Sequence, residues 1–96
     1  MIEIRQTDEY ARWFEGLRDR QSRFRIIARV RRLSLGNPGD VRSVGEGVSE
    51  MRIDCGPGYR VYFTERGRTV VFLLAGGDKK TQSRDIEKAK ELARGL

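Results

Sequence analysis

The chain has 96 residues, enough for one domain, and its 20 Lys and Arg outnumber its 14 Asp and Glu to give a formal net charge of +6. It has no histidine and a single cysteine, Cys55, which excludes an internal disulfide and leaves no cluster with metal-ligand spacing, so we expect neither a metal nor a cofactor. No signal peptide or long apolar run is present, which predicts a cytoplasmic protein with no membrane partner, and the basic charge favours a polyanionic partner.

The N-terminal segment predicts a short strand followed by an amphipathic helix. Residues 1–5 alternate apolar and polar side chains, as a strand does. Thr7 offers an N-cap, with Asp8 and Glu9 in the first turn, where the helix dipole favours anions. An apolar stripe at helical spacing follows, and we assign it to the core: Tyr10, Trp13, Phe14 and Leu17.

A second helix is predicted over about residues 23–35, after a break at residues 19–22, and it forms a helical hairpin with the first. Its apolar face consists of Ile26, Ile27, Val30 and Leu33. Its remaining surface is crowded with arginines: Arg20, Arg23, Arg25, Arg29, Arg31 and Arg32. This run is either a solvated helix face or a surface that follows a phosphate backbone, and Arg29 and Arg32 are candidate substrate contacts in the second case.

Beyond the Gly-Asn-Pro-Gly sequence at residues 36–39 the hydrophobic period changes to two. Val41 and Val44 mark an extended segment, and residues 45–47 a flexible joint. Three strands separated by turns at residues 56–58 and 66–67 then predict an antiparallel meander. The last of them is continuously apolar, which predicts a central strand covered on both faces.

A final helix is expected to begin at a cap formed by Thr81 or Ser83 and to bury Ile86, Ala89 and either Leu92 or Ala93. The predicted fold is therefore α+β and occupies residues 1–96 as one domain. It consists of an N-terminal strand, a helical hairpin, a three-stranded antiparallel meander completing a mixed or antiparallel sheet, and a C-terminal helix.

The candidate site lies at the end of this meander. Arg60 is predicted on a strand, where its planar guanidinium would suit phosphate oxygens, or where it would pair with Glu50 or Asp54 across the hairpin. Lys79 and Lys80 lie just before the last helix, whose N-terminal amides assist anion binding, or they are solvated loop lysines.

Three neighbouring residues complete the candidate set. Arg52 points the same way as Arg60 if the two strands pair as predicted. Tyr62 shares that face and either stacks on a base or packs against the domain. Gln82 either caps the last helix or contacts substrate.

The length, the order of elements and the phrase Gly-Tyr-Arg-Val-Tyr-Phe at residues 58–63 resemble the RelE/ParE superfamily of bacterial toxins from type II toxin–antitoxin modules. The string Gly-Gly-Asp-Lys-Lys-Thr-Gln at residues 76–82, followed by Asp85, Ile86 and Ala89, resembles its HigB-like, phage Gp49-like addiction module killer branch. The resemblance covers nearly the whole chain. It implies a toxin neutralised by a cognate antitoxin, through which the pair also binds operator DNA.

Members of this superfamily either cleave messenger RNA on the ribosome or poison DNA gyrase. In the ribonuclease members, a phosphate-clamping arginine matches Arg60, and a basic residue after the last strand matches Lys79 or Lys80. Their two lysines on the first meander strand fall on Arg52 and Asp54, and the acidic residue departs from that pattern.

A second departure concerns the catalytic tyrosine or histidine that some members carry at the start of the last helix. These positions fall near Asp85 and Ile86, and neither side chain fits that role. Acid–base chemistry would then have to come from Asp85, Asp78 or Tyr62.

The function that the resemblance implies is a metal-independent, ribosome-dependent messenger RNA endoribonuclease. Arg60, Arg52 and Lys79 or Lys80 would contact the scissile phosphate, and the arginine-rich helix would bind ribosomal RNA. One alternative is a non-enzymatic inhibitor of DNA gyrase. Another is a non-toxic, degenerate partner retained for regulation of the operon.

Overall fold

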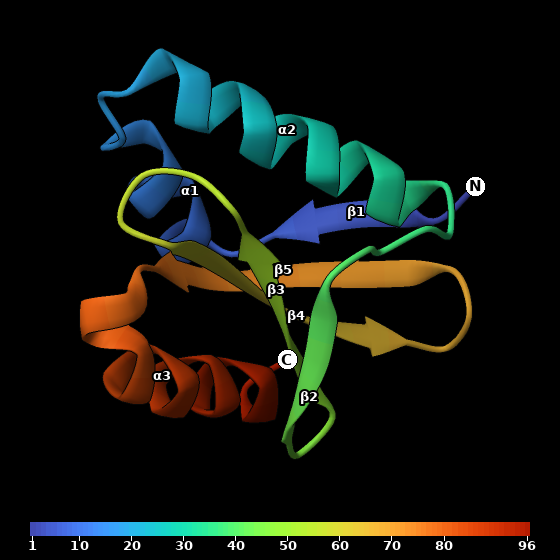
Figure 1. The fold of residues 1–96 in the computed structure, drawn as a ribbon. Helices are drawn as coiled ribbons and strands as arrows, with labels where there is room; N and C mark the ends of the chain where they lie inside the picture. The colour runs from blue at the N-terminus through green and yellow to red at the C-terminus, as the bar shows by residue number, and fades with distance from the viewer.

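The protein folds into three layers, with helices on both faces of one sheet (Figure 1). The computed structural model describes residues 1–96. Helices α1 (Asp8–Glu15) and α2 (Arg20–Ser34) cover one face, and α3 (Gln82–Arg94) covers the other. This arrangement confirms the predicted α+β class and the C-terminal helix.

The sheet has five strands: β1 (Glu3–Gln6), β2 (Val41–Gly45), β3 (Val48–Ile53), β4 (Tyr59–Arg66) and β5 (Val70–Gly77). Their spatial order is β1-β5-β4-β3-β2. The first strand pairs in parallel with β5, and all other pairs are antiparallel, so the sheet is mixed as predicted. The predicted strand at residues 1–5 is displaced by one or two residues to β1.

The meander has four strands, and the prediction of three was wrong. The extended segment around Val41 and Val44 is β2, which pairs with β3. The expected joint at residues 45–47 is a tight hairpin turn, in which Glu46 and Gly47 have φ angles of 54° and 76°. Positive φ at both central residues is what a type I′ turn requires, and such a turn matches the twist of its flanking strands.

Each face of the sheet has its own hydrophobic core. On the side of α1 and α2, nine buried residues form one cluster, which includes Tyr10, Ile26 and Val61. On the side of α3, six buried residues form the second, which includes Tyr62 and Ala89. The strand β5 contributes to both clusters, which confirms that it is a central strand covered on both faces.

The helical hairpin differs from its prediction in two details. Helix α2 begins at Arg20, three residues early, because Asp19 acts as its N-cap and accepts hydrogen bonds from the Gln21 amide and the Ser22 hydroxyl. The prediction that Ile27 faces inward was wrong, since 54% of it is exposed. Ile26 is fully buried, and its neighbour is turned about 100° away around the helix.

The strand-to-helix junction carries a second cap that differs from prediction. A 3-10 turn, η1 (Lys79–Thr81), precedes α3, and the Asp78 carboxylate accepts from the amides of Lys80 and Thr81. Thr81 stands at the N-cap position of α3, but its hydroxyl donates to Asp85 instead of capping that helix. The capped turn fixes where the candidate lysines lie relative to the end of β5.

Candidate functional site

Arg60 is held in place from two directions on β4. Its Nη1 donates to the carbonyl oxygen of Gly58 at 2.7 Å, and its Nε lies 3.6 Å from Oε2 of Glu50. The side chain is 11% exposed, and the buried Nε has no hydrogen-bond partner. The predicted pairing with Glu50 is therefore confirmed. The other amino group, Nη2, makes no hydrogen bond within the chain, so it remains available to an anion.

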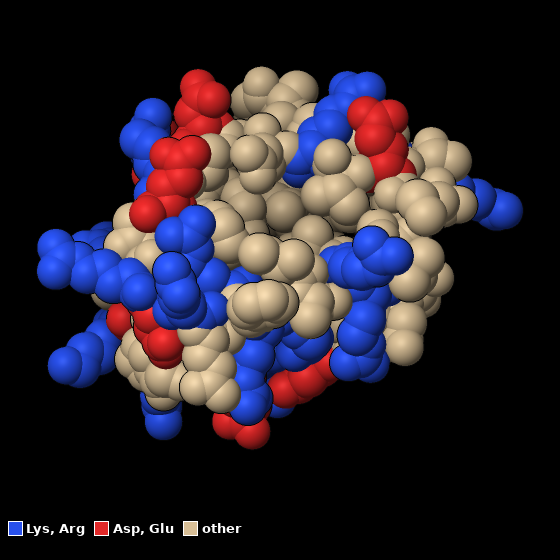
Figure 2. Space-filling model, turned by 90° about the horizontal axis from the view of Figure 1, so that it is seen from above, with Lys and Arg blue, Asp and Glu red and all other residues tan.

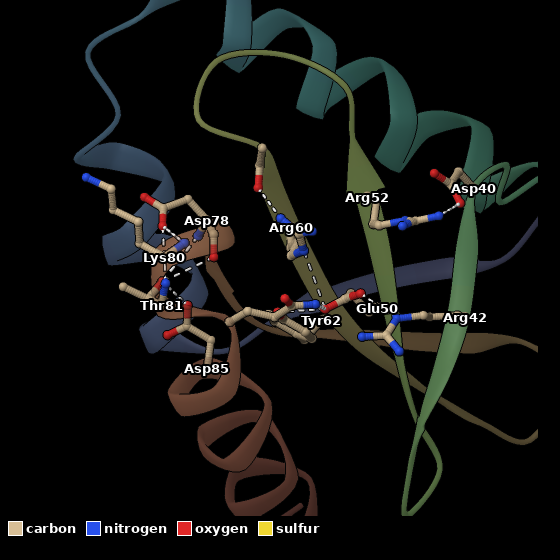
Figure 3. Close-up of polar contacts among 12 residues, drawn as sticks. Asp40, Arg42, Glu50, Arg52, Arg60, Tyr62, Asp78, Lys80, Thr81 and Asp85 are labelled. Atoms are coloured by element: carbon tan, nitrogen blue, oxygen red, sulfur yellow. Dashed lines mark hydrogen bonds and ion pairs between the residues drawn. The ribbon is translucent and has the colours of Figure 1, made fainter.

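Glu50 is the centre of the polar network beneath Arg60 (Figure 3). Its fully buried carboxylate accepts from Arg42 Nε at 2.8 Å, from Gln82 Nε2 at 2.9 Å and from the Tyr62 hydroxyl at 3.0 Å. Burial by itself would raise the pKa of Glu50, but these three hydrogen bonds and the charge of Arg42 outweigh it and lower the pKa. The ionised carboxylate thus ties β2, β3, β4 and α3 together.

Tyr62 belongs to this network and not to an open surface. The side chain has no exposed area, and its hydroxyl is committed to Glu50. Burial, followed by the hydrogen bond to Glu50, raises the pKa of Tyr62, so the phenol stays protonated near neutral pH. The prediction that its ring stacks on a base is contradicted, because α3 and the sheet enclose it.

Arg52 and Arg60 open on to one groove of ≈ 380 Å³ beside the turn between β3 and β4. They are direct neighbours in the register of these strands, as predicted. The Arg52 side chain is exposed and donates to Asp40 Oδ1 at 3.1 Å. Tyr59 also lines this groove, so an aromatic ring adjoins the two guanidinium groups.

Of the two candidate lysines, Lys79 lies beside this groove. Gly58 has a φ of +82°, and a Cβ added to it would lie 3.2 Å from Arg60 Nη1 and 3.6 Å from Lys79 Cβ. The backbone at Gly58 thus lies next to both Arg60 and Lys79, and the absence of a Cβ leaves room for these two side chains. Lys80 extends away from Arg60 (Figure 3). Of the two lysines, Lys79 therefore lies beside Gly58 and the stem of Arg60.

A second carboxyl group on the α3 side, that of Asp85, lies beside the strand position opposite Arg60. Gly77 is the partner of Arg60 across the β4–β5 ladder, and a Cβ added to Gly77 would lie 1.7 Å from Asp85 Oδ2. Residues opposite each other in an antiparallel pair point to the same face about 5 Å apart, so the Asp85 carboxyl group fills the side-chain space next to Arg60. Burial raises the pKa of Asp85, and the hydrogen bond from Thr81 only partly offsets that effect.

The arginines predicted to contact substrate from α2 have different positions. Arg29 donates to the carbonyl oxygens of Arg52, Pro38 and Asp40 at 2.5, 3.0 and 3.3 Å. It is therefore an anchor for the segment that follows α2. Arg32 is exposed and makes no hydrogen bond through its side chain. Gln82 is committed to Glu50 and does not cap α3.

Comparison with protein families assigns the chain to one family. A model of the family described as "Phage derived protein Gp49-like (DUF891)" matches residues 12–94. The chain belongs to the Gp49-like family. This family is related to the toxins of addiction modules, which supports the coarser part of the resemblance seen in the sequence.

One relative of this Gp49-like protein is an uncharacterized protein from Haemophilus influenzae (strain ATCC 51907 / DSM 11121 / KW20 / Rd). The two are 45% identical over 95 residues, which cover 99% of this chain and 96% of the relative. No solved structure matches the chain. None of the helices has the length and apolar character needed to cross a membrane.

The central role of Glu50 and the contribution of Arg42 were not predicted from the sequence of this Gp49-like protein. Glu50 alternates with Met51 along β3 and so lies on the opposite face of the strand, which α3 covers. One sequence signal for this role was present: the strand of Glu50 lies between two strands that each carry an arginine, Arg42 on β2 and Arg60 on β4. Arg42 could not be paired with it because β2 was not recognised as a strand.

Proposed function

We propose that this Gp49-like protein is the toxin of a toxin–antitoxin module and acts as a ribosome-dependent messenger RNA endoribonuclease of the HigB-like, RelE/ParE type. The observation that carries the proposal is Arg60, which is fixed by Gly58 and Glu50 and lines a groove shared with Arg52, while its Nη2 makes no hydrogen bond within the chain. A rigid guanidinium with one free amino group is suited to a phosphate that gains charge during reaction.

Cleavage would begin with attack of a ribose 2′-oxygen on the adjacent phosphorus as the hydroxyl gives up its proton, and the phosphorane formed carries additional negative charge on its equatorial oxygens. The P–O5′ bond would then break and the departing 5′-oxygen would take up a proton, which leaves a 2′,3′-cyclic phosphate and a 5′-hydroxyl end. Arg60 would hold the charge of the phosphorane from the base of the groove, and Arg52 and Lys79 would hold it from the rim. No metal is needed in this proposal, because the cationic side chains supply the charge stabilisation.

Proton transfer is assigned to Asp85 in this proposal. Asp78 is occupied as the cap of η1, and Tyr62 is buried and stays protonated. Asp85 has a raised pKa and fills the space beside the stem of Arg60, and it also lines an open groove of ≈ 540 Å³ between α1 and α3. A carboxyl group with a raised pKa can exchange protons at a pH closer to neutrality than an ordinary one.

Induction of the chain in a bacterium tests this proposal, with messenger RNA 5′ ends mapped alongside growth. Wild-type protein should produce new in-frame ends and arrest growth, and Arg60→Ala should abolish both. Arg66→Ala is the matched control, because Arg66 is on the same strand and also donates to a carbonyl oxygen, that of Ala93, but lies outside the groove. Growth arrest without new ends would reject the nuclease.

Inhibition of DNA gyrase is the second candidate, and one observation favours it. The chain lacks histidine, and of the three acid–base candidates considered above, Tyr62 is enclosed and Asp78 caps η1, which leaves Asp85. A non-enzymatic inhibitor needs no such group. In that case Arg60→Ala would remain toxic, and supercoiling of a plasmid in the induced cells would fall.

The proposed partners follow from the toxin assignment. An antitoxin from the same operon would neutralise this protein, and the pair would bind operator DNA through the antitoxin. Messenger RNA on the ribosome would be the substrate, which places the proposed activity in the cytoplasm. The net charge of +6 favours both the acidic antitoxin segment and the RNA. A chain that binds an antitoxin but never slows growth would instead be the degenerate partner considered above.

A further inference from the structure

The outer surface of α2 carries an apolar stripe that nothing in the fold covers. Phe24 is 76% exposed, Ile27 is 54% exposed, and Leu35 just after the helix is 59% exposed. The first two are one helical turn apart and therefore adjoin. Apart from Met1 and Leu96 at the chain ends, they are the large hydrophobic side chains that this protein exposes.

Two hollows meet at Ile27 and extend this stripe. An apolar hollow of ≈ 200 Å³ includes Tyr10, Phe14 and Val30, and a second of ≈ 330 Å³ lies between Phe24 and the stems of Arg20 and Arg23. Helix α2 has 15 residues, a length of about 22 Å, so the surface is long enough to seat a partner helix of several turns. Contiguous exposed apolar surface of this kind marks an interaction site.

The charges on α2 itself are of one sign, since between Arg20 and Ser34 the helix has six arginines and no acidic residue. Seen from above, this side of the molecule has an uncharged area with Lys and Arg side chains around it, and Asp and Glu side chains also lie at its margins (Figure 2). Apolar surface with a basic border complements an amphipathic helix whose polar edges are acidic.

A nucleic acid fits this surface less well than a protein does. Three of the six arginines are directed back to the chain, since Arg23, Arg25 and Arg29 donate to main-chain carbonyl oxygens. A phosphate backbone would also leave the aliphatic side chain of Ile27 without an apolar partner. A second copy of the chain is disfavoured as well, because a two-fold contact would place the α2 arginines against one another.

We propose that α2 is the docking surface for an acidic, amphipathic helix of the antitoxin, with Phe24 and Ile27 as its apolar anchors. That the partner is the antitoxin rests on the proposed function, whereas its acidic and amphipathic character is inferred only from the apolar and basic side chains of α2. The surface lies on the α1–α2 side of the sheet, and Glu50, which holds Arg60, packs on the α3 side with Tyr62 and Gln82. Docking therefore leaves the Glu50 network intact.

The test is titration of the protein encoded beside this gene in its operon into purified chain, with calorimetric measurement of Kd. The double variant Phe24→Ser with Ile27→Ser should weaken binding by roughly tenfold or more, as anchor residues do. Leu96→Ser is the matched control, because it removes an apolar side chain of similar exposure (49%) beyond α3 and should leave Kd unchanged. Both variants should keep the wild-type Tm, since the altered side chains are exposed.

A second pair of variants tests the charge. Arg31→Glu places an acid beside the stripe and should weaken binding, with a smaller weakening at higher salt. Arg84→Glu makes the same change at an exposed position on α3 and should have little effect. Equal effects of the two would show that net charge alone attracts the partner, and this result would overturn the proposal.

Growth arrest by each variant, expressed without the partner, separates this inference from the proposed function. The Phe24 and Ile27 variant should arrest growth as strongly as wild type while escaping neutralisation by the partner. If the wild-type protein is toxic but its Phe24 and Ile27 variant binds the partner with the wild-type Kd, the docking surface on α2 is rejected and the proposed toxin function is retained. If the protein is not toxic but binds the partner through α2, the docking surface is retained and the proposed toxin function is rejected. Loss of a homodimer or of RNA binding in the apolar variant, with unchanged partner binding, would assign α2 to a different occupant.

Discussion

The buried Oε2 of Glu50 lies 3.6 Å from Nε of Arg60, directly beneath the guanidinium that faces the groove. The two residues come from the adjacent strands β3 and β4, and each also makes hydrogen bonds to other groups. Glu50 also binds three further donors, and Arg60 also binds Gly58. These contacts hold the Arg60 side chain in place and leave its Nη2 without a hydrogen bond within the chain.

Replacement of Glu50 tests the network. Glu50→Ala leaves Arg42, Tyr62 and Gln82 without their shared acceptor, and we expect it to destabilise the fold by about 2 kcal/mol or more. Glu50→Gln keeps one acceptor oxygen and should cost less. Chemical denaturation at neutral pH measures both. Equal stability of Glu50→Ala and wild type would show that the carboxylate is not a structural centre.

The pH dependence of stability provides a separate check. Because the pKa of folded Glu50 lies below its ordinary value, its ionisation stabilises the fold above the ordinary pKa of a glutamate. That contribution is lost as the pH falls through the lowered, folded pKa. The difference in Tm between wild type and Glu50→Gln should therefore shrink on acidification below about pH 4. A difference that grows on acidification would contradict the sign.

Asp85 should behave in the opposite way. Its pKa is raised by burial, so ionisation of Asp85 opposes folding, and stability is lost as the pH rises through the raised pKa. Asp85→Asn removes this cost and keeps an acceptor for Thr81. Its Tm relative to wild type should rise between acidic and neutral pH, while RNA cleavage is lost if Asp85 transfers the proton. Retained cleavage would remove Asp85 from the proposed chemistry.

The glycine pair at the end of β5 is required for close approach. A Cβ at Gly76 would lie 2.2 Å from the Trp13 ring, and a Cβ at Gly77 would lie 1.7 Å from the Asp85 carboxylate. Each alanine replacement should cost about 1–3 kcal/mol through forced displacement of these side chains. Gly16→Ala is the control, since the nearest atom to its added Cβ is 3.4 Å away. Similar losses at all three positions would contradict this explanation.

Much of this architecture could be predicted from local patterns in the sequence. Period-two alternation located β3 and β4, the continuous apolar run located β5, and the Gly-Asn-Pro-Gly segment ended α2. Strand β2 was predicted only as an extended segment and not as a paired strand, because only Val41 and Val44 mark it and its turn uses Glu46 in a left-handed conformation that glutamate rarely adopts. Such a conformation is imposed by tertiary pairing and leaves little trace in sequence.

The sequence predicted which residues of the candidate site share a face of the sheet, but it did not predict all of the contacts that these residues make. The face that Arg60, Arg52 and Tyr62 share follows from alternation, and the register confirms it. The burial of Tyr62 and the anchoring of Arg29 could not be read in the same way. Both depend on which segments pack against these residues: Arg29 bonds to oxygens of Pro38 and Arg52, 9 and 23 residues further along the chain, and Tyr62 is in the cluster that contains Ala89 and Ala93 of α3.

Arg29 and Arg32 provide a prediction that separates an anchor from a surface charge. Arg29→Ala removes three hydrogen bonds to main-chain oxygens and should lower stability by about 1–2 kcal/mol. Arg32→Ala alters an exposed side chain and should leave Tm unchanged. If α2 also contacts RNA, Arg32→Ala will reduce ribosome binding without any loss of stability. Equal Tm for the two variants would contradict the anchoring role.

The decisive measurement for Arg60 is cleavage of messenger RNA on a purified ribosome programmed with a defined codon in the A site. We expect site-specific cleavage by wild-type protein and a loss of about 10²–10³-fold in rate for Arg60→Ala, with full activity in Arg66→Ala. The free Nη2 of Arg60 would then be the group that stabilises the transition state. Wild-type protein that binds the ribosome and leaves the message intact, or Arg60→Ala that cleaves at the wild-type rate, would contradict the account.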